Sequence, residues 1–178
     1  DDELARIETR LRASGERVIR VAEQLSASLS DAALVHYAGH IRRRVVEGEL
    51  RLCLFPPGGV WNSTDLIALT LQRAPVVVLS GCESGDPVTG QRDRVAGLVR
   101  PLFARGARAV VSSHWPLFDA RAVAFMDAFY AAWGAGSSLE NALGDAGRET
   151  LATALAAGVA PTLARLDAAN FHIYALPR

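Results

Sequence analysis

The sequence has no lysine, only two cysteines, and no apolar run long enough to span a membrane. Two cysteines cannot build the disulfide framework of a small secreted protein, and no signal peptide is expected. A cytoplasmic localisation is therefore expected, because a free thiol persists in that reducing compartment. The missing lysine excludes a phosphate-binding loop ending in Gly-Lys, and no cluster of side chains has zinc-ligand spacing. We therefore expect neither a metal nor a cofactor.

An excess of charge of one sign is also missing, since 19 basic residues balance 19 acidic residues. Without an excess of positive charge, binding to nucleic acid or to an anionic membrane surface is not indicated, and neither partner is expected. All the basic residues are arginine, a bias that indicates a GC-rich bacterial genome. The length suits one domain, predicted to cover residues 1–178. The chain begins at Asp1 directly in a helical pattern, which indicates a domain taken from a longer protein.

Short apolar runs alternate with helical patterns, and this alternation predicts βα units. We expect an α/β fold, a three-layer sandwich with helices on both faces of a mainly parallel sheet. The polar stretch 41–49, with the arginine run 42–44, is predicted to be a loop, and residues 50–55 to form a small exposed hairpin. Strands are expected at 17–21, 33–38, 75–80, 107–112 and 171–175, and the last of these at an edge of the sheet. Helices are expected around 4–11, 63–73, 94–105 and 119–133, and for about twenty residues from Ser138.

His40 and Cys82 are the candidate catalytic residues, because each follows an apolar run and should emerge at the same edge of the sheet. Open α/β sheets place their sites at that edge. An imidazole beside a thiol suffices for nucleophilic catalysis, since the base generates the thiolate that attacks a carbonyl group. Small neighbours in the segment SGCES suit a nucleophile on a sharp turn, and Gly39 permits close backbone approach beside His40. The alternatives are a buried, unreactive Cys82 and a His40 that only binds a loop carbonyl.

Other reactive side chains have less specific patterns. His114 follows the 107–112 strand at the same edge, where it would line a substrate pocket or replace His40 as the base. Glu83, Asp86 and Asp119 lie near the expected cleft, where they would select a basic residue before the scissile bond or simply remain solvated. Packed, structural roles are expected for Cys53, His36 and His172.

Three segments together resemble a known family: HYAGH at residues 36–40, VVVLSGCESG at residues 76–85 and WP at residues 115–116. In this order the first two are similar to the signature strands of CHAT domains, which are caspase-like cysteine peptidases of the caspase and separase clan. The resemblance extends from about residue 3 to the end of the chain. It implies a caspase-like fold and hydrolysis of peptide bonds in a protein substrate.

The resemblance also implies residue roles. Cys82 would be the nucleophile and His40 the general base and acid, with a thioester intermediate. Backbone N–H groups of Gly39, Ile41 and Cys82 would stabilise the tetrahedral oxyanion. Trp115 would join His114 at the substrate pocket. A regulatory repeat or sensor domain elsewhere in the full-length protein is the expected partner.

Ile41 departs from the pattern, because family members commonly have glycine directly after the histidine. A catalytically inactive interaction module built on the same sheet therefore stays open as an alternative to the endopeptidase. A third hypothesis is another thiol hydrolase, similar to an amidotransferase, which would release ammonia from glutamine.

Overall fold

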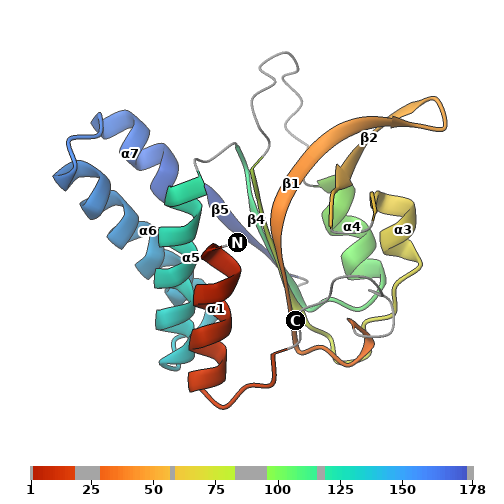
Figure 1. The fold of residues 1–178 in the computed structure, drawn as a ribbon, viewed down its shortest axis with the longest axis horizontal. Helices are drawn as coiled ribbons and strands as arrows, with labels where there is room; N and C mark the ends of the chain where they lie inside the picture. Colours follow the sequence, from red (N-terminus) through yellow and green to blue (C-terminus); the bar gives the residue numbers. More distant parts are fainter. Residues whose placement is uncertain (1, 19–28, 57–58, 83–95, 116–118, 176–178) are drawn as a thin grey trace. The chain divides into compact units, whose positions relative to one another are not determined.

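The computed structural model describes residues 2–18, 29–56, 59–82, 96–115 and 119–175, which form an open sheet and several helices (Figure 1). The five-stranded sheet has the order β2-β1-β3-β4-β5 and confirms the predicted α/β fold. The elements are α1 (Asp2–Ala13), β1 (Leu34–Val46), β2 (Glu49–Leu54), α3 (Ser63–Ile67), β3 (Val76–Cys82), α4 (Ala96–Ala104), β4 (Ala109–Ser113), α5 (Asp119–Gly134), α6 (Leu139–Ala156), α7 (Pro161–Ala168) and β5 (Phe171–Ala175).

The chain divides into two compact units. The helical unit comprises residues 1–19 and 117–172, and the sheet unit comprises residues 20–116 and 173–178. Strand β5 begins in the first and continues into the second, at the edge of the sheet where it was expected. None of the helices in the described ranges is long and apolar enough to cross a membrane.

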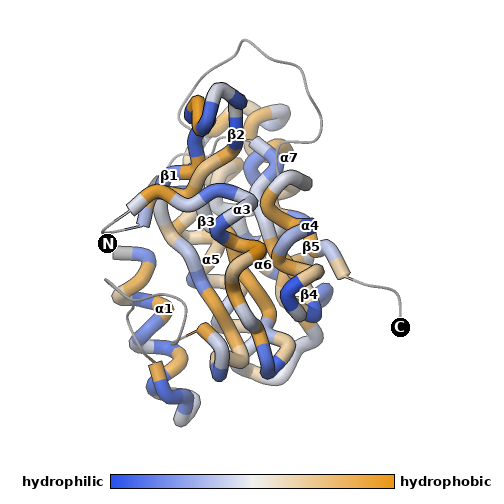
Figure 2. Tube along the Cα trace, turned by 90° about the vertical axis from the view of Figure 1, so that its right-hand side faces the viewer, coloured by the Kyte–Doolittle hydropathy of each residue, from blue (hydrophilic) through white to orange (hydrophobic). Residues whose placement is uncertain are grey.

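Parallel pairing holds the centre of the sheet together. β1 pairs with β3 from Leu34↔Val76 to His40↔Cys82, and β3 pairs in parallel with β4. The valines and leucine of β3 are at most 2% exposed, which explains why this strand is a continuous apolar run rather than an alternating one. Hydrophobic residues predominate in the central strands, whereas the turn that joins β1 and β2 is hydrophilic (Figure 2).

The loop predicted for residues 41–49 was wrong, whereas the hairpin predicted for residues 50–55 is present in part, because residues 50–54 form one of its two strands. β1 continues through the arginine run 42–44 to Val46, turns at Glu47 and Gly48, and returns as the antiparallel strand β2. Both turn residues have positive φ, 53° and 81°, as a two-residue type I′ hairpin turn requires. Cys53 is fully buried in this hairpin, as expected for a packed side chain. The outer part of β1 carries charges and pairs only with β2 among the described strands, so it has no apolar alternation to reveal it.

Helices α3 and α4 cover one face of the sheet unit with leucine side chains. Asn62 is the N-cap of α3, in place of Ser63 or Thr64, which the sequence pattern predicts. Its side chain accepts a hydrogen bond from the Thr64 N–H, while Asp65 accepts one from the Asn62 N–H, a reciprocal capping box. The helix ends at Ile67, well before the predicted end at 73. This core contains Leu29, Ile41, Leu54, Leu66, Leu69, Leu71, Val77, Leu79, Leu98, Val99, Leu102, Ala107 and Val110.

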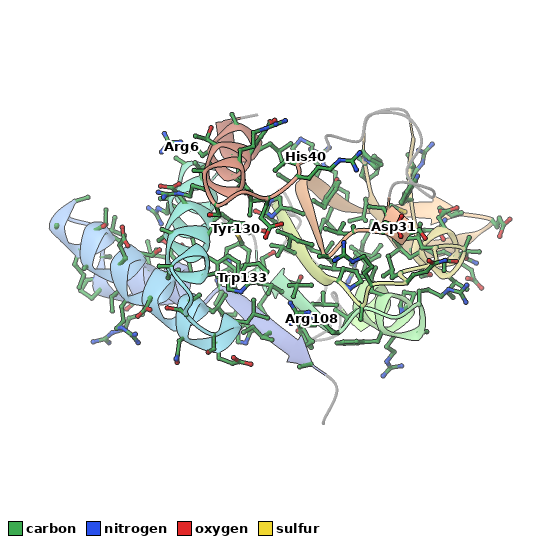
Figure 3. The ribbon with its side chains drawn as sticks, turned by 90° about the horizontal axis from the view of Figure 1, so that it is seen from below. Arg6, Asp31, His40, Arg108, Tyr130 and Trp133 are labelled. Atoms are coloured by element: carbon green, nitrogen blue, oxygen red, sulfur yellow. The ribbon has the colours of Figure 1, made fainter. Side chains whose placement is uncertain are left out.

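The helical unit packs around α5. That helix contacts α1 and α6, and α6 contacts α7. Phe129, Tyr130 and Trp133 on α5 form an aromatic cluster with ring centroids 5.0 to 6.0 Å apart, and Figure 3 shows the last two side by side. Ser138 caps α6 as predicted. Helix α7 was not predicted, although Pro161 in its first turn is a recognised start signal.

A bidentate ion pair joins α1 to α5. Arg10 donates to both carboxylate oxygens of Asp127, at 2.5 and 2.8 Å, and this holds the pKa of Asp127 below its ordinary value. A lowered folded-state pKa stabilises the native protein above the unfolded-state pKa, about 3.9, and that stabilisation is lost as the pH falls through the folded-state pKa.

We therefore expect Asp127→Asn to lower stability at pH 7 and to make progressively less difference below about pH 4. Both side chains are more than a quarter exposed, so the difference at pH 7 should be no more than about 1 kcal/mol. Thermal unfolding followed by circular dichroism between pH 3 and pH 7 measures it. A difference that is the same at pH 3 and pH 7 would contradict this account.

Candidate active site

His40 and Cys82 are register partners on neighbouring parallel strands. Their pairing is the last one between β1 and β3, and adjacent strands lie about 4.8 Å apart. Cys82 is the final residue of β3, a strand predicted to end at residue 80, and His40 lies within β1, because that strand continues past its predicted end at residue 38. His40 is exposed on β1 (Figure 3). The side chain of Cys82 lies outside the described part of the chain.

Ile41, the departure from the family pattern, turns its side chain away from the exposed face of β1. It is only 7% exposed and belongs to the core under α3 and α4. A Cβ at Gly81 would lie 2.3 Å from Cγ1 and 2.5 Å from Cδ1 of Ile41, far closer than carbon atoms approach. Glycine at position 81 is therefore required by the packing of Ile41. The isoleucine side chain lies on the opposite face of β1 from His40.

A tyrosine hydroxyl fixes the backbone of His40. The Tyr37 hydroxyl accepts a hydrogen bond from the Phe55 N–H at 2.9 Å and donates one to the His40 carbonyl at 2.7 Å. It takes the place of the next rung of the β1–β2 ladder, which ends at the pair Ile41↔Leu54. Burial raises the pKa of Tyr37, so its hydroxyl stays protonated and able to donate near neutral pH.

Gly39 makes room for this bridge. A Cβ at Gly39 would lie 2.7 Å from the Tyr37 hydroxyl and 2.9 Å from the adjacent ring carbon. The sequence interpretation assigned this glycine to close approach of a substrate carbonyl. The structure shows a packing requirement at the same position, because the Tyr37 ring lies over the glycine.

Tyr37→Phe is expected to destabilise the protein by about 1–3 kcal/mol, because it removes the common partner of a backbone donor and a backbone acceptor. Urea unfolding measures the loss, and faster amide hydrogen exchange at Phe55 would locate it. Tyr174→Phe is the matched control, since that hydroxyl lies 3.0 Å from Nε2 of the exposed His114. Equal losses in the two variants would show that the bridge contributes nothing.

The backbone of Ile41 faces the side of β1 on which β3 lies. Leu54, its partner on β2, exchanges both of its backbone hydrogen bonds with Trp61, at 2.7 and 2.9 Å. A residue in an antiparallel ladder directs its N–H and C=O to the same side, so the Ile41↔Leu54 pair is not hydrogen-bonded. The Ile41 N–H therefore points away from β2. Gly39, the other predicted oxyanion donor on β1, lies inside the parallel ladder opposite Gly81.

The residue before Cys82 is held from the other side of β3. Ser113, the last residue of β4, is nearly buried and donates its hydroxyl hydrogen bond to the Gly81 carbonyl at 3.0 Å. The sequence interpretation missed both Ser113 and Tyr37. An alternating strand pattern predicts which residues are buried, but it does not reveal a hydroxyl that reaches a neighbouring backbone.

The other predicted site residues are only partly described. His114 follows β4 and is exposed, and its Nε2 lies 3.0 Å from the Tyr174 hydroxyl on β5. Trp115 lies beside it, with ring centroids 5.9 Å apart. Their place in a substrate pocket stays a prediction. Glu83, Asp86 and the side chain of Asp119 lie outside the described residues.

Cys53 is confirmed as a packed side chain rather than a second nucleophile. It is fully buried, and its burial raises the pKa of the thiol. The thiolate is the nucleophilic form, so a thiol with a raised pKa is unreactive near neutral pH. Of the two cysteines in the sequence, only Cys82 ends a strand beside a histidine.

The open five-stranded sheet with its helices is compatible with a caspase-like α/β sandwich. The chain belongs to the CHAT domain family, whose model matches residues 3–163. No curated protein matches the chain. The family is related to caspase-like peptidases, and the predicted family is confirmed.

Proposed function

We propose that the protein is a cysteine endopeptidase in which Cys82 is the nucleophile and His40 the general base and acid. The observation that carries the proposal is the register pair His40↔Cys82 at the end of the parallel β1–β3 ladder. Register partners on neighbouring strands share one face of a sheet, so His40 and Cys82 are neighbouring positions on the same face. The exposure of His40 leaves that place open to a polypeptide.

In the proposed reaction, His40 accepts the proton of the Cys82 thiol, and the thiolate attacks the carbonyl carbon of the scissile peptide bond. The negative charge that develops on the carbonyl oxygen is stabilised by backbone N–H groups near the end of the β1–β3 ladder. Collapse of this intermediate breaks the C–N bond, and the leaving amine takes its proton from the His40 imidazolium. Water, deprotonated by His40, then hydrolyses the thioester and restores the thiol.

The inactive interaction module rested on Ile41, which stands where glycine is usual. Burial of Ile41 against Gly81 weakens that argument, because the added side chain occupies the core and not the face of His40. The proposed substrate is a protein. Regulation by a repeat or sensor domain also remains part of the proposal.

The test is cleavage of a proteome-derived peptide mixture, read by mass spectrometry, before and after treatment with iodoacetamide. We expect cleavage to stop on alkylation, with the adduct on Cys82 and none on the buried Cys53. Cleavage that survives complete alkylation of Cys82, or no thiol-dependent cleavage under any activating condition, would overturn the proposal. Thiol-dependent release of ammonia from glutamine would favour the amidotransferase-like alternative instead.

A further inference from the structure

Two arginines continue the exposed face of β1 beyond His40. His40, Arg42 and Arg44 are exposed, while Ile41 between the first two is buried and Arg43 between the last two is partly buried. This alternation places the three exposed residues on one face of the strand. We call Arg42 and Arg44 the arginine pair.

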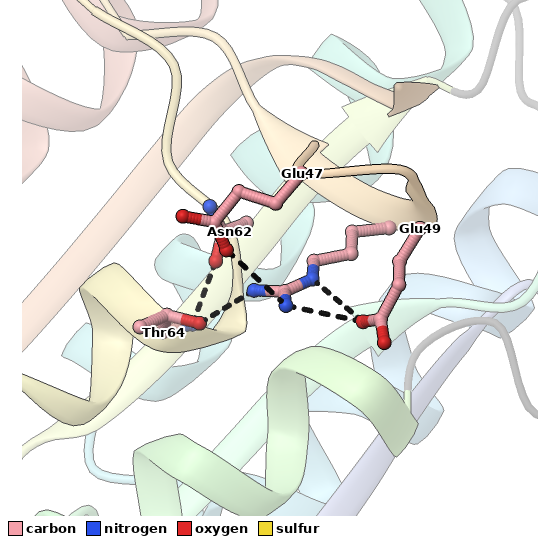
Figure 4. A network of polar contacts seen from close by, with 5 residues as sticks. Glu47, Glu49, Asn62 and Thr64 are labelled. Carbon is pink, nitrogen blue, oxygen red and sulfur yellow. Dashed lines mark hydrogen bonds and ion pairs between the residues drawn. The ribbon is translucent and has the colours of Figure 1, made fainter. Parts of the chain in front are cut away.

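The carboxylates of the hairpin and of α3 are already engaged by other groups. Arg51 binds Glu49 at 3.1 Å and Glu47 at 3.8 Å and donates to the Thr64 hydroxyl at 2.7 Å (Figure 4). Asp65 accepts the Asn62 N–H at 2.8 Å. Across the described ranges, neither member of the arginine pair makes an ion pair. The two guanidinium groups are therefore left for a ligand with negative charge.

We propose that the arginine pair selects substrates whose chain beside the scissile bond is extended and acidic. Residues two apart on a strand lie about 6.6 Å apart, and an extended peptide places alternate side chains at the same interval. Carboxylates at alternate positions therefore match Arg42 and Arg44 one to one. This inference rests on the proposed function, because His40 marks where the scissile bond lies. It predicts acidic residues two and four positions from the cut, on one side of it.

The first arm of the test compares cleavage specificities on the peptide mixture. For the wild-type protein we expect Asp and Glu to be enriched two and four residues from the cut. In the double variant Arg42→Glu, Arg44→Glu the enrichment should change to Arg and Lys, because the sign of the surface is reversed. Arg108→Glu is the matched control, since Arg108 is exposed just before β4, at the opposite end of the parallel strands from His40 (Figure 3).

The second arm uses a well-cleaved acidic peptide and a copy in which the two acidic residues are replaced by their amides. We expect KM for the acidic peptide to rise by about tenfold or more in the double variant, with kcat nearly unchanged. The difference should shrink as salt is raised, because exposed charges are screened. An unchanged preference for the acidic peptide in the double variant would overturn the inference.

A third arm separates failure of this inference from failure of the proposed function. Binding of the labelled acidic peptide to Cys82→Ala protein is followed by fluorescence anisotropy, with no cleavage required. If the Arg42→Glu, Arg44→Glu substitutions abolish this binding, the result supports recognition of acidic peptides by the arginine pair, even if the wild-type protein cleaves nothing. Equal binding of the acidic and amide peptides, by a protein whose wild type cleaves in a thiol-dependent way, would leave the peptidase standing and refute the arginine pair.

Discussion

Cys82→Ala is expected to lower kcat/KM for peptide cleavage by at least about 10⁴-fold. Losses of this size are seen when the nucleophile is removed from a set of catalytic residues that act together. The effect should fall on kcat, because the thiol takes part in bond making and contributes little to ground-state binding. Mass spectrometry of a slowly cleaved ester substrate should detect a thioester on wild-type protein and none on the variant.

Cys53→Ala is the matched control, since it removes the only other thiol in the sequence. Cys53 is fully buried in the hairpin core, so this variant should lose some stability but retain activity at temperatures below its unfolding transition. Retained cleavage in Cys82→Ala, or equal loss of activity in both variants, would contradict the assignment of the nucleophile. Far-ultraviolet circular dichroism of both variants controls for folding.

The central strands β3 and β4 could be predicted because they are buried along their length. Val76 to Leu79 read as an apolar run without alternation, and the structure places them in β3 with almost no exposure. The outer half of β1 could not be predicted in the same way. Its arginines lie on a strand whose only described partner is β2, so its sequence shows the composition of a loop.

Two of the missed boundaries had readable signals. Asn62 and Asp65 form a capping box, with Asp in the place usually held by Glu or Gln, so the pattern of a cap residue followed three positions later by an acidic residue was present in the sequence. Pro161 marks the first turn of α7.

The candidate dyad of His40 and Cys82 could be predicted from the two segments that contain it. The contacts that hold the neighbouring backbone in place could not. The Tyr37 hydroxyl reaches the His40 carbonyl only because Phe55, 18 residues later, arrives beside it at the end of β2. Gly39 and Gly81 were interpreted as clearance for a substrate. Gly39 packs against Tyr37, which lies two residues earlier on the same strand, and Gly81 packs against Ile41, which lies on the neighbouring strand β1. The second contact depends on the register of the two strands, which the sequence does not reveal.

Gly81→Ala should be the most damaging single-methyl change near the site, with a loss of about 2–3 kcal/mol in the free energy of unfolding. The new Cβ would overlap two carbon atoms of the Ile41 side chain and lie 2.9 Å from the Gly39 carbonyl oxygen, so β1 and β3 would have to move apart. Gly97→Ala is the matched control. Gly97 is exposed on α4 with nothing within 4 Å of a new Cβ, and alanine there should stabilise the helix by about 0.5–1 kcal/mol.

The contact between Gly81 and Ile41 can be isolated with a double-mutant cycle. Ile41→Ala alone should cost about 2–4 kcal/mol, because it leaves a cavity in the core under α3 and α4. In the double variant, the alanine at position 81 fills part of that cavity instead of overlapping a side chain. The double variant should therefore lose at least about 1 kcal/mol less than the sum of the two single losses, measured by urea unfolding. Additive losses would mean that Ile41 does not require glycine at position 81, and would restore substrate clearance as the reason for that glycine.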